Sequence, residues 1–323
     1  MVQDQLRALV HRYPLVRFAT RQLRVHLPRR FGGLDPARVP PRNRRFTLDL
    51  PRPEDDRRRV GADTITLQLS GDLTVPRRLA ASGLSGHEPD SLASFMAILD
   101  HTRPGAVLDV GAGVGVYSML AAARTPRPVF AFEPTPELAA AARAVSASGD
   151  LGFGVVDLAL SNHNGSGHLR RALHNDMCNR LVNSTRMGLS HITVRTATLS
   201  RWNETAATFP TVVKIDTSGT EPDVIAGGLE VLRRFRPWVM TKVRPDRGVE
   251  ERLMALMDPL EYLWFPISGD PPYEARSEIS GRASPAWERM WMFAPEEPPS
   301  EFWDAVTVWR TALGSCRGAP ADR

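Results

Sequence analysis

The chain has 323 residues, of which 42% are hydrophobic and 24% charged, and its formal net charge is +5. These values are ordinary for a globular protein with a sizeable core, so a collagen-like chain, a wholly disordered chain and a disulfide-rich mini-protein are excluded. The two cysteines, Cys178 and Cys316, lie far apart in the sequence. Neither a disulfide framework nor a cysteine-rich zinc site is therefore expected.

The N-terminal segment is strongly basic and rich in proline. Residues 1–60 contain 15 arginines and six acidic residues, and we interpret them as an extension that precedes the main domain. Such an extension can contact phosphate groups or an anionic lipid surface, or it can lie as a solvated helix on the main domain. Arginines interrupt residues 1–30, so we expect no signal peptide, no transmembrane segment and a cytoplasmic protein.

Strand-like and helix-like segments alternate through the main domain, which we place at residues 61–313, with a flexible tail at 314–323. This alternation predicts βαβ units and an α/β fold with a doubly wound, mostly parallel, Rossmann-like sheet of seven strands. The apolar runs that predict its strands are residues 106–110, 129–132, 153–160, 211–215, 238–243, 262–267 and 290–294. The predicted helices are residues 91–101, 118–124, 136–146 and 222–235, and an alternating run at 64–69 predicts a further strand.

A glycine-rich turn follows the first strand of this series. The sequence VLDVGAGVG places Gly111, Gly113 and Gly115 between a strand and a helix, and Glu133 ends the next strand. Glycines let a ligand approach the backbone closely, and the helix N-terminus offers free N–H groups. A carboxylate at the end of the second strand is placed to accept both hydroxyls of a ribose. The pattern predicts a nucleoside-binding site.

Two cofactors share this geometry. Nicotinamide enzymes use G-x-G-x-x-G, whose third glycine is replaced here by Val116. The observed G-x-G-x-G spacing, preceded by Asp109, is typical of enzymes that use S-adenosylmethionine. A P-loop for nucleotide triphosphates is excluded because neither lysine of the chain follows a glycine.

Residues 82–243 resemble the FkbM family of S-adenosylmethionine-dependent methyltransferases. The blocks that carry the resemblance are GHEPD at residues 86–90, VLDVGAGVGVYS at 107–118, VFAFEPTPE at 129–137, VVDLALSNHNGSG at 155–167, TATLSRW at 196–202 and VVKIDTSGTEPDVIAGG at 212–228. The resemblance implies a class I methyltransferase sheet, S-adenosylmethionine as cofactor, and methylation of a hydroxyl on a natural product, sugar or glycolipid. It also implies a set of cofactor-binding residues: Glu88, Asp109, Gly111, Gly113, Gly115, Tyr117, Glu133, Pro134, Asp157, Ala159 and Ser161, with adenine expected near Asp157 to Ser161.

The chain departs from the family pattern at three positions. Ser200, Ser218 and Lys242 stand where the family commonly has an acidic residue. Divalent cations need several oxygen ligands, so we expect no metal site. The departures also leave open a changed acceptor, or a protein that binds the cofactor but has little activity and uses its basic arm for interaction.

Asp216 and His163 are the candidate catalytic residues. Methyl transfer to an alcohol is an in-line displacement in which the hydroxyl must lose its proton to a base. Asp216 ends the strand at 211–215, where open α/β sheets bind ligands, and His163 follows the third strand. Lys242, which we assign to the acceptor side, can pair with Asp216 and hold it ionised, which would make it a weaker base. Glu221 is placed to interact with the dipole of the helix that it begins.

The sequence DPPY at residues 270–273 offers a competing interpretation. This motif occurs in enzymes that methylate amino groups of adenine or cytosine in DNA. Only fifty residues follow it here, and VVKID already takes the place of the fourth strand. We therefore expect no nucleic-acid partner, and we assign Tyr273 and Trp287 to the acceptor pocket. The acceptor and the oligomeric state stay undetermined at this stage.

Overall fold

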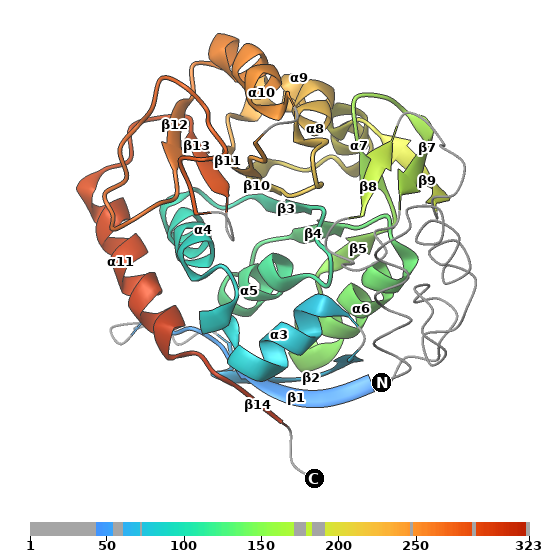
Figure 1. The fold of residues 1–323 in the computed structure, drawn as a ribbon, viewed down its shortest axis with the longest axis vertical. Coiled ribbons are helices and arrows are strands. Elements are labelled where there is room, and N and C mark those ends of the chain that lie inside the picture. Colours follow the sequence, from blue (N-terminus) through green and yellow to red (C-terminus); the bar gives the residue numbers. More distant parts are fainter. Residues whose placement is uncertain are drawn as a thin grey trace, which may run out of the picture.

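A seven-stranded sheet forms the centre of the molecule (Figure 1). The computed structural model describes residues 43–53, 61–71, 73–170, 179–182, 191–245, 248–285 and 289–320. The strand order is β12-β13-β11-β10-β3-β4-β5; β5, β4, β3, β10 and β11 are parallel, and β13 is antiparallel to β11 and β12. The strands are β3 (Ala106–Val110), β4 (Val129–Phe132), β5 (Gly154–Val156), β10 (Pro210–Ile215), β11 (Trp238–Lys242), β12 (Leu263–Pro266) and β13 (Met290–Ala294).

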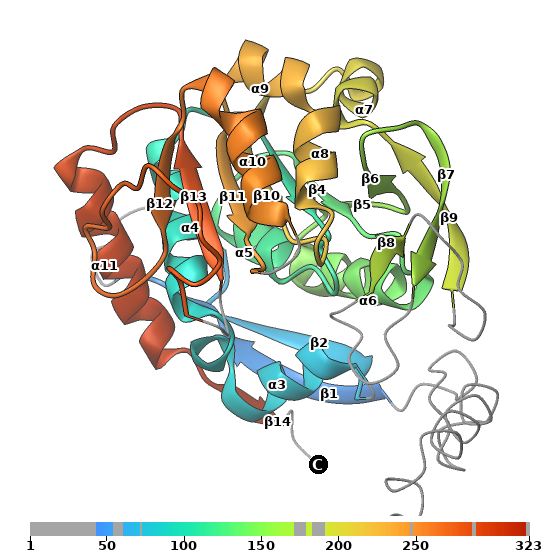
Figure 2. The same ribbon diagram turned by 45° about the horizontal axis from the view of Figure 1, so that its top comes forward.

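Helices cover both faces of this sheet, so its central strands β3, β10 and β11 are buried along their whole length (Figure 2). One face packs against α4 (Pro89–His101), α5 (Val116–Arg124), α6 (Pro136–Ser146) and α11 (Ser300–Ser315). The other face packs against α7 (Leu199–Ala206), α8 (Glu221–Gly227), α9 (Leu229–Phe235) and α10 (Val249–Met257). The predicted doubly wound sheet is therefore confirmed.

The chain leaves β3 toward β4 and β5 on one side, and it continues from β10 toward β11 on the other. The boundary between β3 and β10 is thus the point where the strand order reverses, and open α/β sheets bind ligands at the carboxyl ends of strands at such a point. The glycine turn follows β3 and Asp216 follows β10, so both lie at this position.

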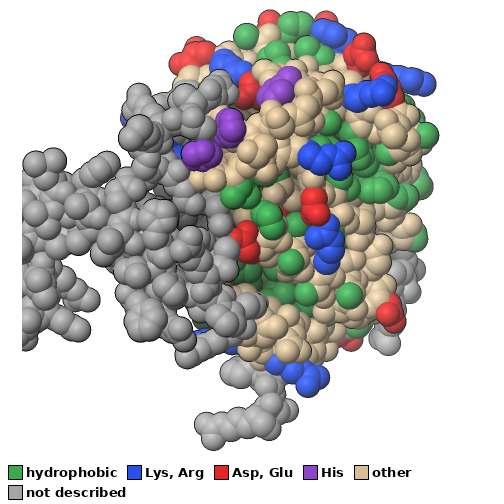
Figure 3. All heavy atoms as spheres, turned by 90° about the vertical axis from the view of Figure 1, so that its right-hand side faces the viewer, with side chains coloured by type: hydrophobic (Ala, Val, Ile, Leu, Met, Phe, Trp, Pro, Cys, Tyr) green, Lys and Arg blue, Asp and Glu red, His purple; other side chains and the backbone are tan. Residues whose placement is uncertain are grey.

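A four-stranded sheet lies beside β5 and contains β6 (Ala159–Leu160), β7 (Gly165–Arg170), β8 (Arg180–Val182) and β9 (His191–Ala197), in the order β6-β9-β7-β8. The run at 153–160, predicted as one strand, thus supplies strands to two sheets. On the outer face of the small sheet, the ring centroids of His168 and His191 lie 5.7 Å apart. Histidine side chains are prominent on the side of the molecule that Figure 3 shows.

A third sheet joins segments that are far apart in the sequence. It contains β1 (Asn43–Asp49), β2 (Thr64–Ser70) and β14 (Gly318–Pro320), and β1 pairs with both of the others. The short helix α3 (Thr74–Ser82) packs against this sheet, and single 3-10 turns occur at η3 (Leu84–Gly86), η4 (Ser148–Asp150) and η6 (Asp258–Leu260).

These elements differ from the sequence-based expectations at three further places. Residues 43–49 belong to a buried sheet rather than a loose extension, because Phe46 and Leu48 face the core. The expected flexible tail at 314–323 is wrong in its described part, since α11 continues to Ser315 and β14 pairs with β1. The helix predicted at 222–235 is divided between α8 and α9 at Gly228.

Residues 1–42, which hold most of the predicted basic extension, lie outside the described residues. No helix among the described residues is both long enough and apolar enough to cross a lipid bilayer.

We predict that Phe46→Ala lowers the free energy of unfolding by about 3–5 kcal/mol, because it leaves a cavity in the core. The neighbouring Arg45 is exposed, so Arg45→Ala serves as the control and should change this free energy by about 0.5 kcal/mol or less. Urea unfolding of both variants measures the difference. Equal unfolding midpoints would show that β1 lies outside the cooperative unit.

Candidate functional site

A cavity opens at the carboxyl ends of β3, β4 and β10. Its empty space is about 880 Å³, counted out into the open mouth. Most of the residues that the sequence assigns to a cofactor line it, together with the candidate catalytic Asp216. These are Glu88, Gly111, Gly113, Tyr117, Glu133, Pro134 and Ala159.

The turn after β3 needs glycine at two positions for different reasons. At Gly111 a Cβ atom would lie 2.0 Å from the carbonyl oxygen of Asp216, so the turn can cross the end of β10 only without a side chain. At Gly113 a Cβ would meet no atom within 4 Å, but its φ of 59° is in the left-handed region that favours glycine. Gly113 lines the cavity.

Glu133 follows β4, and its carboxylate is held by two backbone amides. Gly113 N donates to Oε2 at 2.9 Å, and Thr135 N donates to Oε1 at 2.8 Å. Burial raises the pKa of Glu133 to about 7, although these hydrogen bonds favour the charged form. Each oxygen has a second lone pair, so the carboxylate can accept two further hydrogen bonds from a diol.

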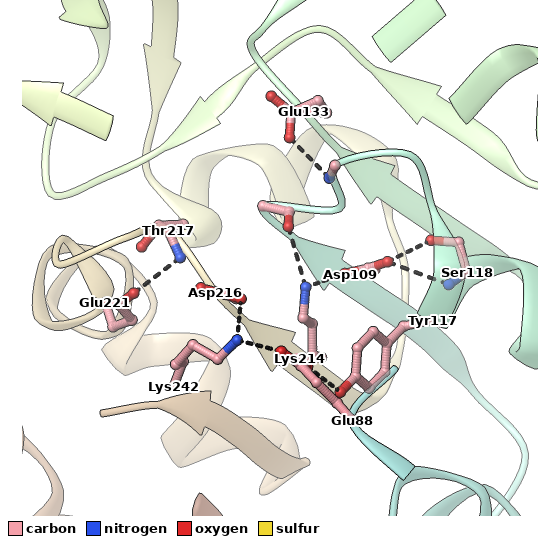
Figure 4. A network of polar contacts seen from close by, with 12 residues as sticks. Glu88, Asp109, Tyr117, Ser118, Glu133, Lys214, Asp216, Thr217, Glu221 and Lys242 are labelled. Carbon is pink, nitrogen blue, oxygen red and sulfur yellow. Dashed lines mark hydrogen bonds and ion pairs between the residues drawn. The ribbon is translucent and has the colours of Figure 1, made fainter. Parts of the chain in front are cut away.

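A buried ion pair supports the glycine turn from below (Figure 4). Lys214 Nζ donates to Asp109 Oδ1 at 2.9 Å and to the carbonyl oxygen of Gly111 at 3.1 Å. The other oxygen of Asp109 accepts hydrogen bonds from the amide and hydroxyl of Ser118. Asp109 thus lies beneath the turn and does not line the cavity. Sequence reasoning did not assign Lys214 a role, although a lysine inside the apolar strand VVKI was the available signal.

A second buried ion cluster lies beside the first. Lys242 Nζ lies between two carboxylates, 2.7 Å from Glu88 Oε1 and 2.9 Å from Asp216 Oδ2 (Figure 4). Tyr117 completes the cluster by donating its hydroxyl to Glu88 Oε2 at 3.3 Å. The hypothesis that Lys242 pairs with Asp216 is confirmed. Lys242 itself is not among the residues that line the cavity.

This cluster fixes the charge of Asp216. Burial alone would raise the pKa of Asp216, but Lys242, Lys214 and Arg244 outweigh burial and lower it to about 2. Burial would also lower the pKa of Lys242, and the carboxylates of Asp216 and Glu88 raise it instead. Asp216 is therefore ionised at neutral pH and is a weak base, so it is suited to orient a ligand rather than to remove a proton from an alcohol.

Several residues that the sequence assigned to the site lie elsewhere. His163 is exposed, does not line the cavity, and contacts Asn162 Oδ1 at 3.0 Å. Tyr273 is buried against Trp303, with ring centroids 5.5 Å apart, and is also absent from the lining. Gly115, Asp157 and Ser161 do not line the cavity either. Trp287 lies outside the described residues.

Glu221 stabilises the loop that precedes its own helix. Its carboxylate accepts hydrogen bonds from the backbone amides of Thr217 and Gly219 at 2.9–3.1 Å. Burial raises its pKa, and the charge of Asp216 adds to this effect. Glu221 thus has a structural role in shaping the β10–α8 loop.

The charged end of the cavity suits the amino-acid end of a sulfonium cofactor. Asp216 Oδ1 and Thr217 Oγ1 are buried and make no hydrogen bond within the described residues. Both atoms can accept from an ammonium group. No group of three or more histidine, cysteine, aspartate or glutamate side chains in the described ranges is arranged to hold a metal ion.

The strand order, with the antiparallel β13 inserted between β11 and β12, defines the class I methyltransferase fold. Residues 109–263 match the model of the methyltransferase FkbM domain. The match identifies a methyltransferase FkbM domain in this part of the chain.

Three solved structures illustrate its relatives. Methyltransferase FkbM from Methylobacillus flagellatus is 12% identical, with 59% of this chain and 43% of that chain covered and a TM-score of 0.38. This chain thus spans less than half the length of that protein. A putative O-methyltransferase from Klebsiella pneumoniae is 12% identical, with 64% and 78% covered and a TM-score of 0.35. The O-methyltransferase TomG from Streptomyces achromogenes, involved in tomaymycin synthesis and solved with SAM, is 14% identical, with 64% and 78% covered and a TM-score of 0.34. A comparison with curated proteins found no match.

We predict that Lys242→Met destabilises the protein by about 3–5 kcal/mol at pH 7, because Glu88 and Asp216 would be left as buried carboxylates without their cation. The pKa of Asp216 is lowered from 3.8 to about 2, so this ionic stabilisation is present above pH 4 and is lost as the pH falls toward 2. The difference between variant and wild type should shrink over that range in urea unfolding.

Arg252→Met is the matched control, because Arg252 forms an exposed ion pair with Asp223. Loss of this ion pair should lower the free energy of unfolding by about 1 kcal/mol or less. Equal losses for the two variants, or a Lys242→Met loss that does not change with pH, would contradict the assignment.

Proposed function

We propose that this protein transfers a methyl group from S-adenosylmethionine to a hydroxyl group of a small molecule, sugar or glycolipid. The observation that carries the proposal is the Glu133 carboxylate, which lies against the glycine turn in a cavity at the strand reversal point. This is the place where a ribose diol would bind. The match of residues 109–263 to the methyltransferase FkbM domain supports the same cofactor.

When bound, the cofactor would supply an electrophilic methyl group on a positively charged sulfur. The O–CH3 bond would form as the S–CH3 bond breaks, with release of S-adenosylhomocysteine and of the hydroxyl proton. The protein's own contribution is to hold the acceptor oxygen in line with that carbon and to exclude water. Glu133 fixes the ribose, and the buried ion clusters under Gly111 and beside Asp216 fix the wall of the cavity. Asp216 can orient a ligand by accepting a hydrogen bond from it or by pairing with a positively charged group.

A second candidate function is cofactor binding with little catalysis. It is favoured by the ion pair that neutralises Asp216 and lowers its basicity. Ser218 lines the cavity at a position where the family commonly has an acidic residue.

Calorimetry with S-adenosylmethionine and with NAD⁺ tests the cofactor, and we expect binding of the first alone. Incubation of the protein with methyl-labelled cofactor and extracts of the source organism then tests the reaction. A labelled product with an O-methyl group supports the proposal. Tight cofactor binding without any labelled product would support the second candidate.

We predict that the affinity for S-adenosylmethionine rises as the pH increases through about 7. Burial raises the pKa of Glu133 to about 7, and only the ionised carboxylate can accept both ribose hydroxyls. Between pH 6 and pH 8 the dissociation constant should fall by about tenfold. Calorimetry at several pH values measures this change.

Glu133→Gln provides the control for that prediction. The variant should bind more weakly at pH 8, and any pH dependence that it retains belongs to the ligand or to other groups. Parallel pH profiles for wild type and variant would show that Glu133 does not titrate on binding.

A further inference from the structure

Among the described residues, His87 is the histidine that lines the cavity. It lies between η3 and α4, directly before Glu88 of the buried ion cluster. The residue is only 5% exposed, and its Nδ1 is buried without a hydrogen-bond partner in the described part of the chain. A buried polar atom that stays unpaired costs free energy. His87 therefore offers the cavity a hydrogen-bonding side chain that the described protein groups do not satisfy.

The backbone on both sides of His87 is fixed. Its amide donates to the carbonyl oxygen of Leu84 at 3.0 Å. The next residue, Glu88, has a φ of 49°, in the left-handed region that residues other than glycine rarely adopt. Both carboxylate oxygens of Glu88 are bonded, Oε1 to Lys242 and Oε2 to the hydroxyl of Tyr117 (Figure 4). The imidazole is thus carried by a rigid segment, as a group that must meet a reacting atom has to be.

The imidazole of His87 is neutral at physiological pH. Burial lowers its pKa to about 4, because the charged imidazolium loses its solvation there. The charge of Glu88 opposes this effect, and three cations add to it, Lys242, Arg78 and Lys214. A neutral imidazole has one N–H and one nitrogen with a free lone pair. His87 can therefore accept a hydrogen bond, and a proton, at neutral pH.

The carboxylates that line the cavity are engaged elsewhere. Asp216 and Glu88 share the ammonium group of Lys242, and Glu133 is assigned to the ribose. Protonation of Asp216 would remove the negative charge that pairs with Lys242, whereas protonation of His87 breaks no hydrogen bond of Nδ1 within the described residues. The site thus contains one neutral nitrogen base, at a position that the ion pairs leave available.

We propose that the imidazole of His87 binds the hydroxyl group of the methyl acceptor and receives its proton, an inference that rests on the proposed function. The acceptor oxygen gains positive charge as the O–CH3 bond forms, while the electron pair of the S–CH3 bond stays on sulfur. The hydroxyl proton then becomes far more acidic than the proton of an imidazolium, so it passes to His87 although this imidazole is a weak base. The imidazolium returns the proton to water after the products leave.

The first test compares His87→Gln with the wild type, both as the full-length protein. The amide of glutamine can accept a hydrogen bond but cannot hold the proton. With methyl-labelled S-adenosylmethionine and an extract of the source organism, the labelling rate at saturating extract should fall by about 100-fold or more. The dissociation constant for S-adenosylhomocysteine, measured by calorimetry, should stay within about threefold of the wild-type value.

His168→Gln is the matched control, because His168 is exposed and does not line the cavity. This variant should label the extract at the wild-type rate. It shows whether the loss of any histidine changes the assay.

His87→Gly adds a measurement that a purely structural role would not affect. Free imidazole should restore its labelling rate by about tenfold or more, whereas pyrrole, a ring of the same size without a basic nitrogen, should restore none. Only neutral imidazole accepts a proton, so at saturating cofactor the restored rate should rise as the pH increases through about 6.5.

The outcomes separate the two proposals. Failure of the wild type to bind S-adenosylhomocysteine would overturn the proposed function and this inference together. Binding by the wild type without any labelled product would support the second candidate function and overturn this inference. An unchanged labelling rate in His87→Gln would overturn the inference and leave the proposed function standing. Loss of S-adenosylhomocysteine binding in both His87 variants, with no rescue by imidazole, would assign His87 to folding or cofactor binding and would also overturn it.

Discussion

The ammonium group of Lys214 fixes the glycine turn relative to strands β3 and β10. It is almost fully buried, and it bonds at once to the strand that precedes the glycine turn, through Asp109, and to the turn itself, through the carbonyl of Gly111. A buried cation is tolerated only when its partners satisfy it. The turn therefore keeps one position relative to β10, and the amide of Gly113 keeps its place beside Glu133. The ligand cavity depends on this arrangement because its wall is the turn.

Most of the charges around the cavity are paired within the protein. Lys242 forms ion pairs with both Asp216 and Glu88, and Lys214 forms one with Asp109. Glu133 lines the cavity and differs from these carboxylates, because its described hydrogen bonds come from the backbone amides of Gly113 and Thr135. A carboxylate with neutral donors is free to exchange a proton near neutral pH, whereas one with a buried lysine is not. The site thus contains one carboxylate that can titrate near neutral pH, Glu133, and another, Asp216, that stays ionised beside Lys242.

The glycine turn and the acid beside it could be predicted from the sequence, because the residues that mark them lie close together in the chain. The run VLDVG ends a buried strand in glycine, and Glu133 follows the next strand, so the turn and its acid were expected where they lie. The positions of His163, Tyr273 and Asp157 could not be predicted in this way. Tyr273 is packed against Trp303, 30 residues further along the chain, whereas the exposed His163 and Asp157 contact nearby residues, Asn162 and Arg143, on the surface. A motif indicates residue type and order, but the direction of a side chain on a loop is decided by tertiary packing.

The same limit applies to the small sheets. Nothing local marks Asn179 as a residue that lines the cavity; it directly precedes β8, which pairs with β7. The pairing of β1 with β14 likewise joins residues about 270 positions apart, and Arg317 N donates to Asp49 Oδ2 across that distance. The pairing of β1 with β14 cannot form on the ribosome until translation has passed residue 320.

The parallel centre of the large sheet, whose strands lie between residues 106 and 242, can assemble earlier. The region around Phe46 would then reach its final packing late in synthesis, and it is the region where a chaperone would find exposed apolar surface for longest.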